Sequence, residues 1–249
     1  MSPLADLLTA VRLLTVIPLG TREGERPARY LPLVGWLFGV LAAGIASGAV
    51  ALGVSDGLGA LFTATVIVGA WALLSGFLHL DGIADTADGM GVRGDAERRL
   101  AVMRDSSIGT FGVAALVLVL SVQIAAVAMI VESGSWWGLG AAPVIGRSGA
   151  AAALFARRPA RGDGLAARLA EPASPGAVLV MLVAVALLLA FPPDVGRIAI
   201  VLGGAGITLW MPGVFTRRLG GITGDVLGAV IVLTETAVLV ACALVGGLA

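Results

Sequence analysis

Long apolar runs constrain the fold of this chain more than any other feature of its sequence. A helix that crosses a hydrocarbon core of about 30 Å needs roughly 20 apolar residues, and run after run reaches that length. Only 13% of the 249 residues are charged and 58% are hydrophobic, whereas a soluble domain carries about 25% charged residues. The sequence therefore predicts an all-α, polytopic integral membrane helix bundle that forms a single domain over residues 1–249.

We expect about seven transmembrane helices, preceded by an N-terminal amphipathic helix over residues 4–17 that lies at the membrane surface. Arg147 interrupts the fourth run and Pro212 is predicted to end the sixth, so both runs are candidates for re-entrant segments. Asp95 is a residue type that caps helices and predicts a short interfacial helix. The predicted spans are residues 31–54, 58–80, 108–131, 136–155, 176–191, 195–211 and 226–248.

The chain has 16 arginines, no lysine and one histidine. The distribution of the arginines predicts how the protein is oriented in the membrane. With seven spans, every arginine except Arg147 and Arg197 falls on the side of the N-terminus. Cytoplasmic loops collect arginine in membrane proteins. We therefore expect a multi-pass protein of the cell (cytoplasmic) inner membrane, with this side facing the cytoplasm.

An acidic motif directly follows the second predicted span and holds Asp81, Asp85 and Asp88. On a helix these residues stand at i, i+4 and i+7 and share one face. Like charges on one face repel each other, and hard cations such as Mg²⁺ take carboxylate and phosphate oxygens together. We expect these aspartates to bind one or two Mg²⁺ ions that bridge a pyrophosphate. The alternative is a solvated acidic loop at the membrane surface.

Two further segments on the same side have residues suited to phosphate. Arg104 offers a guanidinium fork, and Asp105 or Ser106 beside it is otherwise an ordinary helix cap. A glycine-rich run opens the last span, where backbone amides can approach an anion. The residues of interest in that run are Gly221, Thr223, Gly224 and Asp225.

Three ionisable residues within or beside the spans have two interpretations each. His79 is either a hydrogen-bonded structural residue or a site residue that orients a carboxylate or exchanges a proton. Arg147 is either the counter-ion of an inward carboxylate or a phosphate ligand. Glu235 makes either a functional contact or a simple interhelical hydrogen bond.

Several of these motifs together are similar to those of a known family. The run of residues 77–89 closely resembles the signature of cobalamin synthase, the adenosylcobinamide-GDP ribazoletransferase family. Residues 32–35, 103–106 and 220–229 resemble further parts of that family in the same order. The loop of residues 157–171 matches least well, so its role stays open.

The resemblance implies the last assembly step of the cobamide nucleotide loop. Adenosylcobinamide-GDP and α-ribazole, or its 5′-phosphate, give adenosylcobalamin, or its 5′-phosphate, and GMP in a reaction that requires Mg²⁺. We expect Asp81, Asp85 and Asp88 to hold the metal, and Asp105 or Asp225 to act as base or second metal contact, with His79 as a further catalytic candidate. The expected substrate contacts are Arg104, Ser106, Arg147, Gly221, Thr223 and Gly224.

The expected partners are the two substrates and the lipid bilayer, and a homo-oligomer or an association with other cobamide-assembly enzymes is compatible with the family. The arginine-rich loops follow membrane topology, which favours anionic lipid or a phosphorylated substrate over nucleic acid.

Three other classes of protein are alternatives. An enzyme of the CDP-alcohol phosphotransferase type shares the start of its motif with Asp85, Asp88 and Arg93, but its downstream pair of spaced aspartates is missing. A transporter would place its essential acids near mid-membrane, whereas this acidic motif lies at one edge. A purely structural subunit would not need so many charged motifs.

Overall fold

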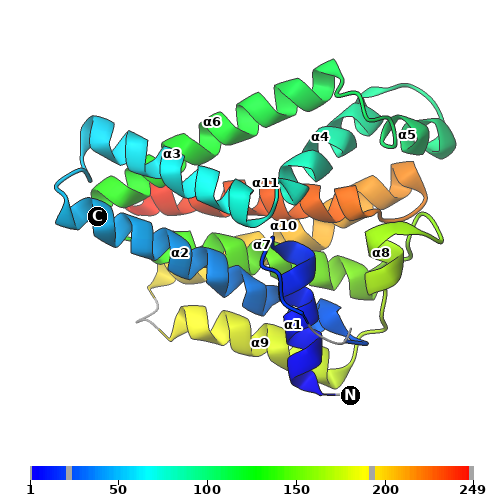
Figure 1. Ribbon diagram of the computed structural model, residues 1–249, viewed down its shortest axis with the longest axis horizontal. Helices are drawn as coiled ribbons and strands as arrows, with labels where there is room; N and C mark the ends of the chain where they lie inside the picture. Colours follow the sequence, from blue (N-terminus) through cyan, green and yellow to red (C-terminus); the bar gives the residue numbers. More distant parts are fainter. Residues whose placement is uncertain (1, 21–23, 191–193, 247–249) are drawn as a thin grey trace.

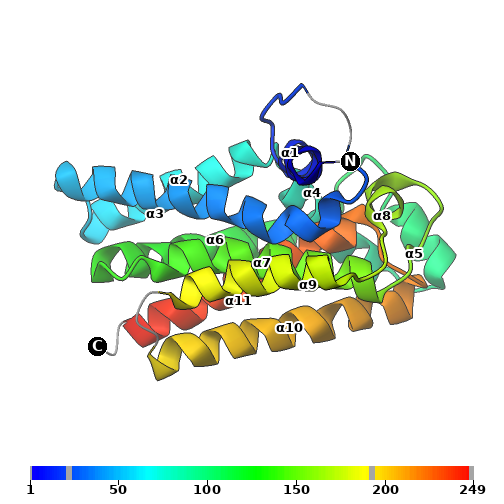
Figure 2. The ribbon, with the colours of Figure 1, turned by 90° about the horizontal axis from the view of Figure 1, so that it is seen from below.

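The computed structural model describes residues 2–20, 24–190 and 194–246. Within these ranges all regular secondary structure is helical, apart from one isolated β-bridge between Pro159 and Ile222 (Figure 1). Most helices run along the long axis of the molecule, whereas α1 lies across it, as Figures 1 and 2 both show. The elements are α1 (Pro3–Leu14), η1 (Pro27–Tyr30), α2 (Leu31–Ala51), α3 (Gly57–Leu74), α4 (Leu78–Gly91), α5 (Ala96–Val102), α6 (Thr110–Ser133), α7 (Trp137–Ala156), α8 (Gly164–Leu169), α9 (Pro175–Leu189), α10 (Val195–Leu219) and α11 (Gly224–Gly246).

The predicted all-α membrane bundle is confirmed. In the described ranges, 6 helices are long and apolar enough to cross a membrane, namely α2 with η1, α3, α6, α7, α10 and α11. The fifth predicted span corresponds to α9, whose 15 residues rise about 22 Å, less than a core of about 30 Å. The predicted ends of spans five and seven, at residues 191 and 248, lie outside the described residues.

Helices α7 and α11 form the centre of the bundle, because most of their side chains are buried. Helix α7 packs against α2, α9, α10 and α11, while α11 also packs against α4 and α6. Small residues make the α2–α7 contact close: a Cβ atom on Gly39 would lie 2.9 Å from the Cα of Gly140. Such contacts are typical of helices that associate in lipid, where close backbone packing replaces the hydrophobic driving force.

The second span ends earlier than predicted, at Leu74 instead of residue 80. Gly76 and Phe77 both adopt positive φ, and their amides bond back to Leu73 and Ala72 at 3.0 and 2.8 Å. These two bonds form a Schellman motif, which stops one helix and lets the chain restart in a new direction. The apolar sequence continues through the break, so hydropathy alone cannot locate it. The acidic motif consequently lies on a separate helix, α4.

The sixth span does not end at Pro212, because α10 continues through it to Leu219. Proline lacks an amide donor, but prolines are tolerated inside membrane helices when hydroxyl side chains and neighbouring helices compensate. The carbonyl that loses its helical donor is that of Thr208, one turn earlier, and Pro212 itself is buried against the neighbouring helices. The fourth span is likewise continuous, since α7 runs through Arg147.

One end of the bundle collects the short helices and the loops that carry charge. Figure 1 shows α4, α5, α8 and the start of α11 together at the end away from the C-terminus. Asp95 caps α5 as predicted, accepting a hydrogen bond from the amide of Arg98 at 3.0 Å. Candidate site residues from distant parts of the sequence therefore meet at this end.

Candidate functional site

Helices α4 and α11 cross in backbone contact. A Cβ atom on Gly82 would lie 2.7 Å from the carbonyl oxygen of Asp225, and one on Gly228 would lie 3.3 Å from the Cα of Gly82. Only glycine fits such a crossing, because the two main chains occupy the space that a side chain would need. The crossing places Asp225, in the first turn of α11, beside the acidic helix.

The carboxyl group of Asp85 has a pKa shifted by its surroundings at this crossing. Its pKa rises to about 7, first of all because it is partly buried. The neighbouring charges of Asp81, Asp225 and Asp88 raise the pKa further, since like charges favour the protonated acid. Arg161 acts in the opposite direction. A cation among these oxygens would relieve the same repulsion, so the group is electrostatically suited to a metal ion.

Asp88 is buried and already has partners on the next helix. Its carboxylate oxygens accept hydrogen bonds from the amides of Gly109 at 2.7 Å and Gly112 at 2.9 Å. These amides open α6, where an acidic group satisfies otherwise unpaired donors and the helix dipole. Asp88 therefore joins α4 to α6.

The three predicted metal ligands are not assembled as one set. Across residues 2–20, 24–190 and 194–246, no three acidic, histidine or cysteine side chains are grouped closely enough to hold an ion. Asp81 is exposed and Asp85 half-buried, and both lie close enough to Asp225 to interact with its charge. Asp88 instead points to the start of α6.

The loop that resembles the family least is fixed against the start of α11. The amide of Ala160 donates to the carbonyl of Ile222 at 2.8 Å, and the amide of Ile222 donates to the carbonyl of Arg158 at 3.0 Å. A Cβ atom on Gly221 would lie 2.5 Å from the amide nitrogen of Ala160. Gly221 thus serves this close packing of the two loops.

This attachment brings Arg161, a residue that no sequence motif singles out, to the acidic group. Its charge acts on both Asp85 and Asp225. Its Nη2 donates to the carbonyl of Leu100 at 3.1 Å, and its Nε is buried without a hydrogen-bond partner. The only sequence signal for it was the arginine content of the loop, which topology alone explains.

A cavity of about 140 Å³ lies at this place. It is lined by Leu78, Arg161, Asp163, Gly164, Leu165, Ile222, Thr223, Gly224 and Asp225. The Thr223 hydroxyl donates to Asp225 Oδ2 at 3.2 Å and accepts from the amide of Val226 at 3.2 Å. Thr223 therefore caps α11 and fixes one carboxylate oxygen of Asp225 at the same time.

Arg104, Asp105 and Ser106 lie in the exposed connection between α5 and α6. The guanidinium of Arg104 is 3.9 Å from Asp163, a residue of the cavity wall. Asp105 accepts a hydrogen bond from the amide of Ser107 at 2.9 Å, which lowers the pKa of its carboxyl. The residue at the N-cap of α6 is Gly109, so neither Asp105 nor Ser106 caps that helix.

Arg147 is fully buried and is the counter-ion of an inward carboxylate, the first of its two interpretations. Its Nη1 lies 2.6 Å from Glu235 Oε1 and also donates to the carbonyl of Pro143 at 3.2 Å. The guanidinium carbon stands 3.7 Å from the ring centre of Phe38. The ion pair links α7 to α11, and Arg147 does not line the 140 Å³ cavity.

His79 is buried in the same interior cluster as Arg147. Its ring centre is 6.3 Å from that of Phe38, and its Nε2 has no hydrogen-bond partner. On α4 it stands two residues before Asp81, so the two side chains leave the helix on nearly opposite sides. The structure therefore separates His79 from the carboxylate face.

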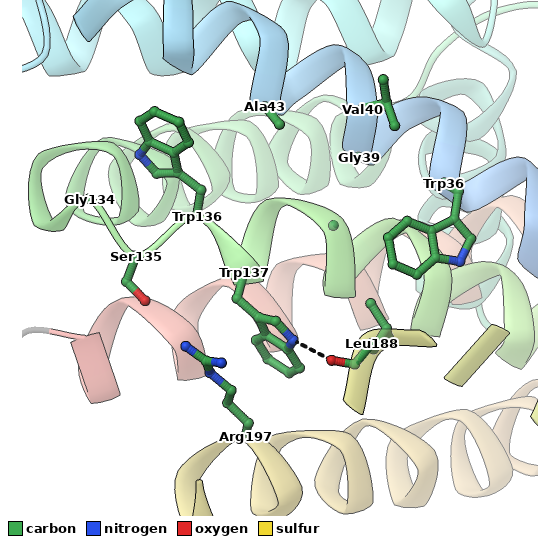
Figure 3. A pocket seen from close by; sticks show the side chains of 11 residues that line it. Trp36, Gly39, Val40, Ala43, Gly134, Ser135, Trp136, Trp137, Leu188 and Arg197 are labelled. Atoms are coloured by element: carbon green, nitrogen blue, oxygen red, sulfur yellow. Dashed lines mark hydrogen bonds between the residues drawn. The ribbon is translucent and has the colours of Figure 1, made fainter. Parts of the chain in front are cut away.

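A larger cavity, about 420 Å³, lies at the other end of the bundle between α2, α7, α9 and α10 (Figure 3). Its wall is mainly indole and aliphatic, with Trp36, Trp136 and Trp137 around it and Arg197 at its edge. The indole of Trp137 donates to the carbonyl of Leu188 at 2.9 Å. Among the residues that the structure describes, no carboxylate lines this cavity, so its described wall lacks the oxygen ligands that phosphoryl chemistry with Mg²⁺ needs.

Comparisons with known proteins agree with one another. The family model described as cobalamin-5-phosphate synthase matches residues 6–243. A protein of Pseudomonas savastanoi pv. phaseolicola named adenosylcobinamide-GDP ribazoletransferase is 40% identical over 226 residues, 89% of each chain. Proteins of the same name from Pseudomonas fluorescens and Sinorhizobium medicae are 39% and 37% identical; they cover 94% and 96% of this chain and 97% and 96% of their own. No solved structure matches the chain.

Proposed function

Because the chain belongs to the cobalamin-5-phosphate synthase family over nearly its whole length, we propose that it is a membrane transferase that completes a cobamide. It joins adenosylcobinamide-GDP to α-ribazole, or to α-ribazole 5′-phosphate. The products are adenosylcobalamin, or its 5′-phosphate, and GMP. The name that the relatives share supports the donor and the acceptor, and the family description supports the product.

One observation carries the assignment of the site: three distant segments converge at one end of the bundle. The acidic face of α4, the start of α11 and the loop with Arg161 interact electrostatically there. Carboxylates opposed by an arginine beside a cavity form the kind of group that can hold a phosphate and its metal ion.

We propose that Asp81, Asp85 and Asp88 hold Mg²⁺ once an ion and a phosphate draw the side chains of Asp81 and Asp85 toward Asp88, since the described residues do not group the three by themselves. The donor set consists of carboxylate oxygens, the ligands that Mg²⁺ prefers, and the raised pKa of Asp85 marks a site that is short of positive charge. Asp88 can serve both α6 and an ion, since a carboxylate has about four lone-pair sites. When bound, the ion neutralises charge on the phosphoryl oxygens.

Asp225 is the residue that we propose as general base. It lines the cavity, and the hydroxyl of Thr223 fixes one of its oxygens. Asp105 and His79, the other catalytic candidates, do not line that cavity. A ribazole hydroxyl would pass its proton to Asp225 while its oxygen bonds to the phosphorus attached to cobinamide. The bond from that phosphorus to the bridging oxygen breaks, and GMP leaves with the electron pair.

We also propose that the carboxylate end faces the cytoplasm in the cell membrane. The support is the arginine content of this end, which follows the rule for cytoplasmic loops. Nucleotide substrates are then on the side where the cavity opens.

The reaction is tested with purified protein in detergent or lipid nanodiscs. Incubation with adenosylcobinamide-GDP, α-ribazole and Mg²⁺ should release GMP, and chelation of the metal should stop the release. A CDP-alcohol offered as donor should give no CMP. Absence of GMP in every detergent and lipid condition would refute the proposed reaction.

A further inference from the structure

We propose that Arg161 binds a phosphate group of the substrate within the 140 Å³ cavity, opposite the carboxylates of α4 and α11. This inference rests on the proposed function and assigns a role to the loop that resembles the family least. It is carried by the placement of the side chain, by its unused donor and by the size of the cavity.

The placement of Arg161 is fixed by the main chain. Two backbone hydrogen bonds hold the loop against Ile222, at 2.8 and 3.0 Å, and the bond from Nη2 to the carbonyl of Leu100 holds the guanidinium. The side chain is therefore oriented before any ligand arrives. An oriented arginine loses less side-chain freedom on binding than a mobile one does.

The guanidinium has donors left over. Within the ranges that the structure describes, no carboxylate lies within salt-bridge distance of Arg161, although Asp85 and Asp225 both interact with its charge. Its Nε is buried without a partner. A buried donor without a hydrogen bond costs free energy. The Arg161 side chain also lines the cavity, where its remaining N–H groups can give a phosphate oxygen charge-assisted bonds.

The size of the cavity limits what it can hold. Clefts that enclose a drug-sized ligand measure roughly 300–1,000 Å³, well above the 140 Å³ here. A corrinoid cannot enter, whereas a phosphate group can. The amide end of α11 at Gly224 lines the same cavity and offsets part of the negative charge that Asp163 and Asp225 contribute to its wall.

The kinetic test compares Arg161→Gln and Arg161→Lys with Arg158→Gln, a matched control on the same loop whose side chain is exposed. Arg161→Gln should raise a substrate KM by at least roughly 10-fold, the loss expected for one charge-assisted hydrogen bond. Arg161→Lys should recover part of the loss, because it keeps the charge and loses the fork. Arg158→Gln should behave as the unsubstituted protein.

Two acceptors identify which phosphate is bound. If the donor pyrophosphate is bound, the KM for adenosylcobinamide-GDP rises with either acceptor. If the phosphate of the acceptor is bound, the KM rises for α-ribazole 5′-phosphate and not for α-ribazole. Values for Arg161→Gln that match Arg158→Gln with both acceptors would overturn the inference, as would a loss of thermal stability with unchanged KM values.

A binding measurement keeps this inference separate from the proposed reaction. Inorganic pyrophosphate with Mg²⁺ should bind the unsubstituted protein and Arg158→Gln, and bind Arg161→Gln at least roughly 10-fold more weakly. Failure of GMP release with this binding pattern intact would refute the reaction alone. Equal pyrophosphate binding by all three proteins would exclude the donor pyrophosphate as the group that Arg161 binds. Equal binding of α-ribazole 5′-phosphate by all three proteins as well would refute the role of Arg161 alone.

Discussion

At the scale of single residues, the three aspartates of α4 differ in exposure and in hydrogen bonding. Asp81 is exposed and Asp85 half-buried, whereas the oxygens of Asp88 bond the amides that open α6. The spacing of these residues predicted a shared face, which is a local property of a helix. It could not predict the partner of Asp88, because that partner comes from a different helix.

Substitution of each aspartate by asparagine distinguishes a role in metal binding from a role in stabilising the fold. We expect Asp81→Asn and Asp85→Asn to reduce Mg²⁺-dependent GMP release by at least roughly 100-fold, with thermal stability close to that of the unsubstituted protein. Asp88→Asn should in addition lower stability by about 1–3 kcal/mol, because its hydrogen bonds lose their charge. Thermal unfolding and GMP release measured on the same samples check this. Equal stability of all three variants would contradict the role of Asp88 in joining α4 to α6.

The buried pair of Arg147 and Glu235 gives a second test with single residues. Glu235→Ala should destabilise the protein by roughly 3–5 kcal/mol, because it leaves a buried charge without its partner. The double variant Arg147→Met with Glu235→Leu should regain most of that loss. Thermal unfolding and substrate KM values check this. A double variant that is stable but has a strongly raised KM would instead make Arg147 a phosphate ligand.

At the scale of elements, the crossing of α4 and α11 positions the site. The sequence predicted the last span and a shared helix face for the aspartates, and it singled out the glycine-rich start of that span as a place where the backbone can approach an anion. It did not predict that Gly82 and Gly228 approach each other, since a contact between segments this far apart depends on the whole bundle. The break at Gly76 and Phe77 was missed for a related reason: hydropathy measures composition, whereas the break depends on backbone conformation.

Enlarging Gly82 tests the importance of that crossing. In Gly82→Ala the new methyl group would meet the backbone of Asp225 at 2.7 Å, so the helices must separate, at a cost of roughly 1–3 kcal/mol. GMP release should fall by at least roughly 10-fold as Asp225 moves away from α4. Gly69→Ala in α3 is the control, because nothing lies within 4 Å of its added Cβ atom. Similar activity of the two variants would show that the crossing does not position the site.

At the scale of the whole molecule, the amino-acid sequence predicted the membrane bundle, the presence of an N-terminal helix and the concentration of charge at one end. Apolar length and arginine distribution determine these features, and both are read directly from the chain. The position of Arg161 was not predictable, since it depends on two loops about 60 residues apart that meet only after the bundle has formed.

The orientation of the molecule can be tested by labelling. In a Cys242→Ser background, which removes the only cysteine, Ser106→Cys and Ser135→Cys each add one exposed thiol at opposite ends of the bundle. A maleimide that cannot cross membranes should label Ser135→Cys in intact spheroplasts. It should label Ser106→Cys only after lysis. The reverse pattern would place the carboxylate end outside the cytoplasm.

The attachment of the loop that carries Arg161 has a consequence for the divergence of relatives. Its two hydrogen bonds to Ile222 use only main-chain atoms, which every residue except proline can supply at the donor positions. Side chains in this loop can therefore drift over evolutionary time without displacing the loop itself. A relative whose loop aligns poorly with this one can still present a cation at the same point, and structural superposition would find it where sequence comparison does not.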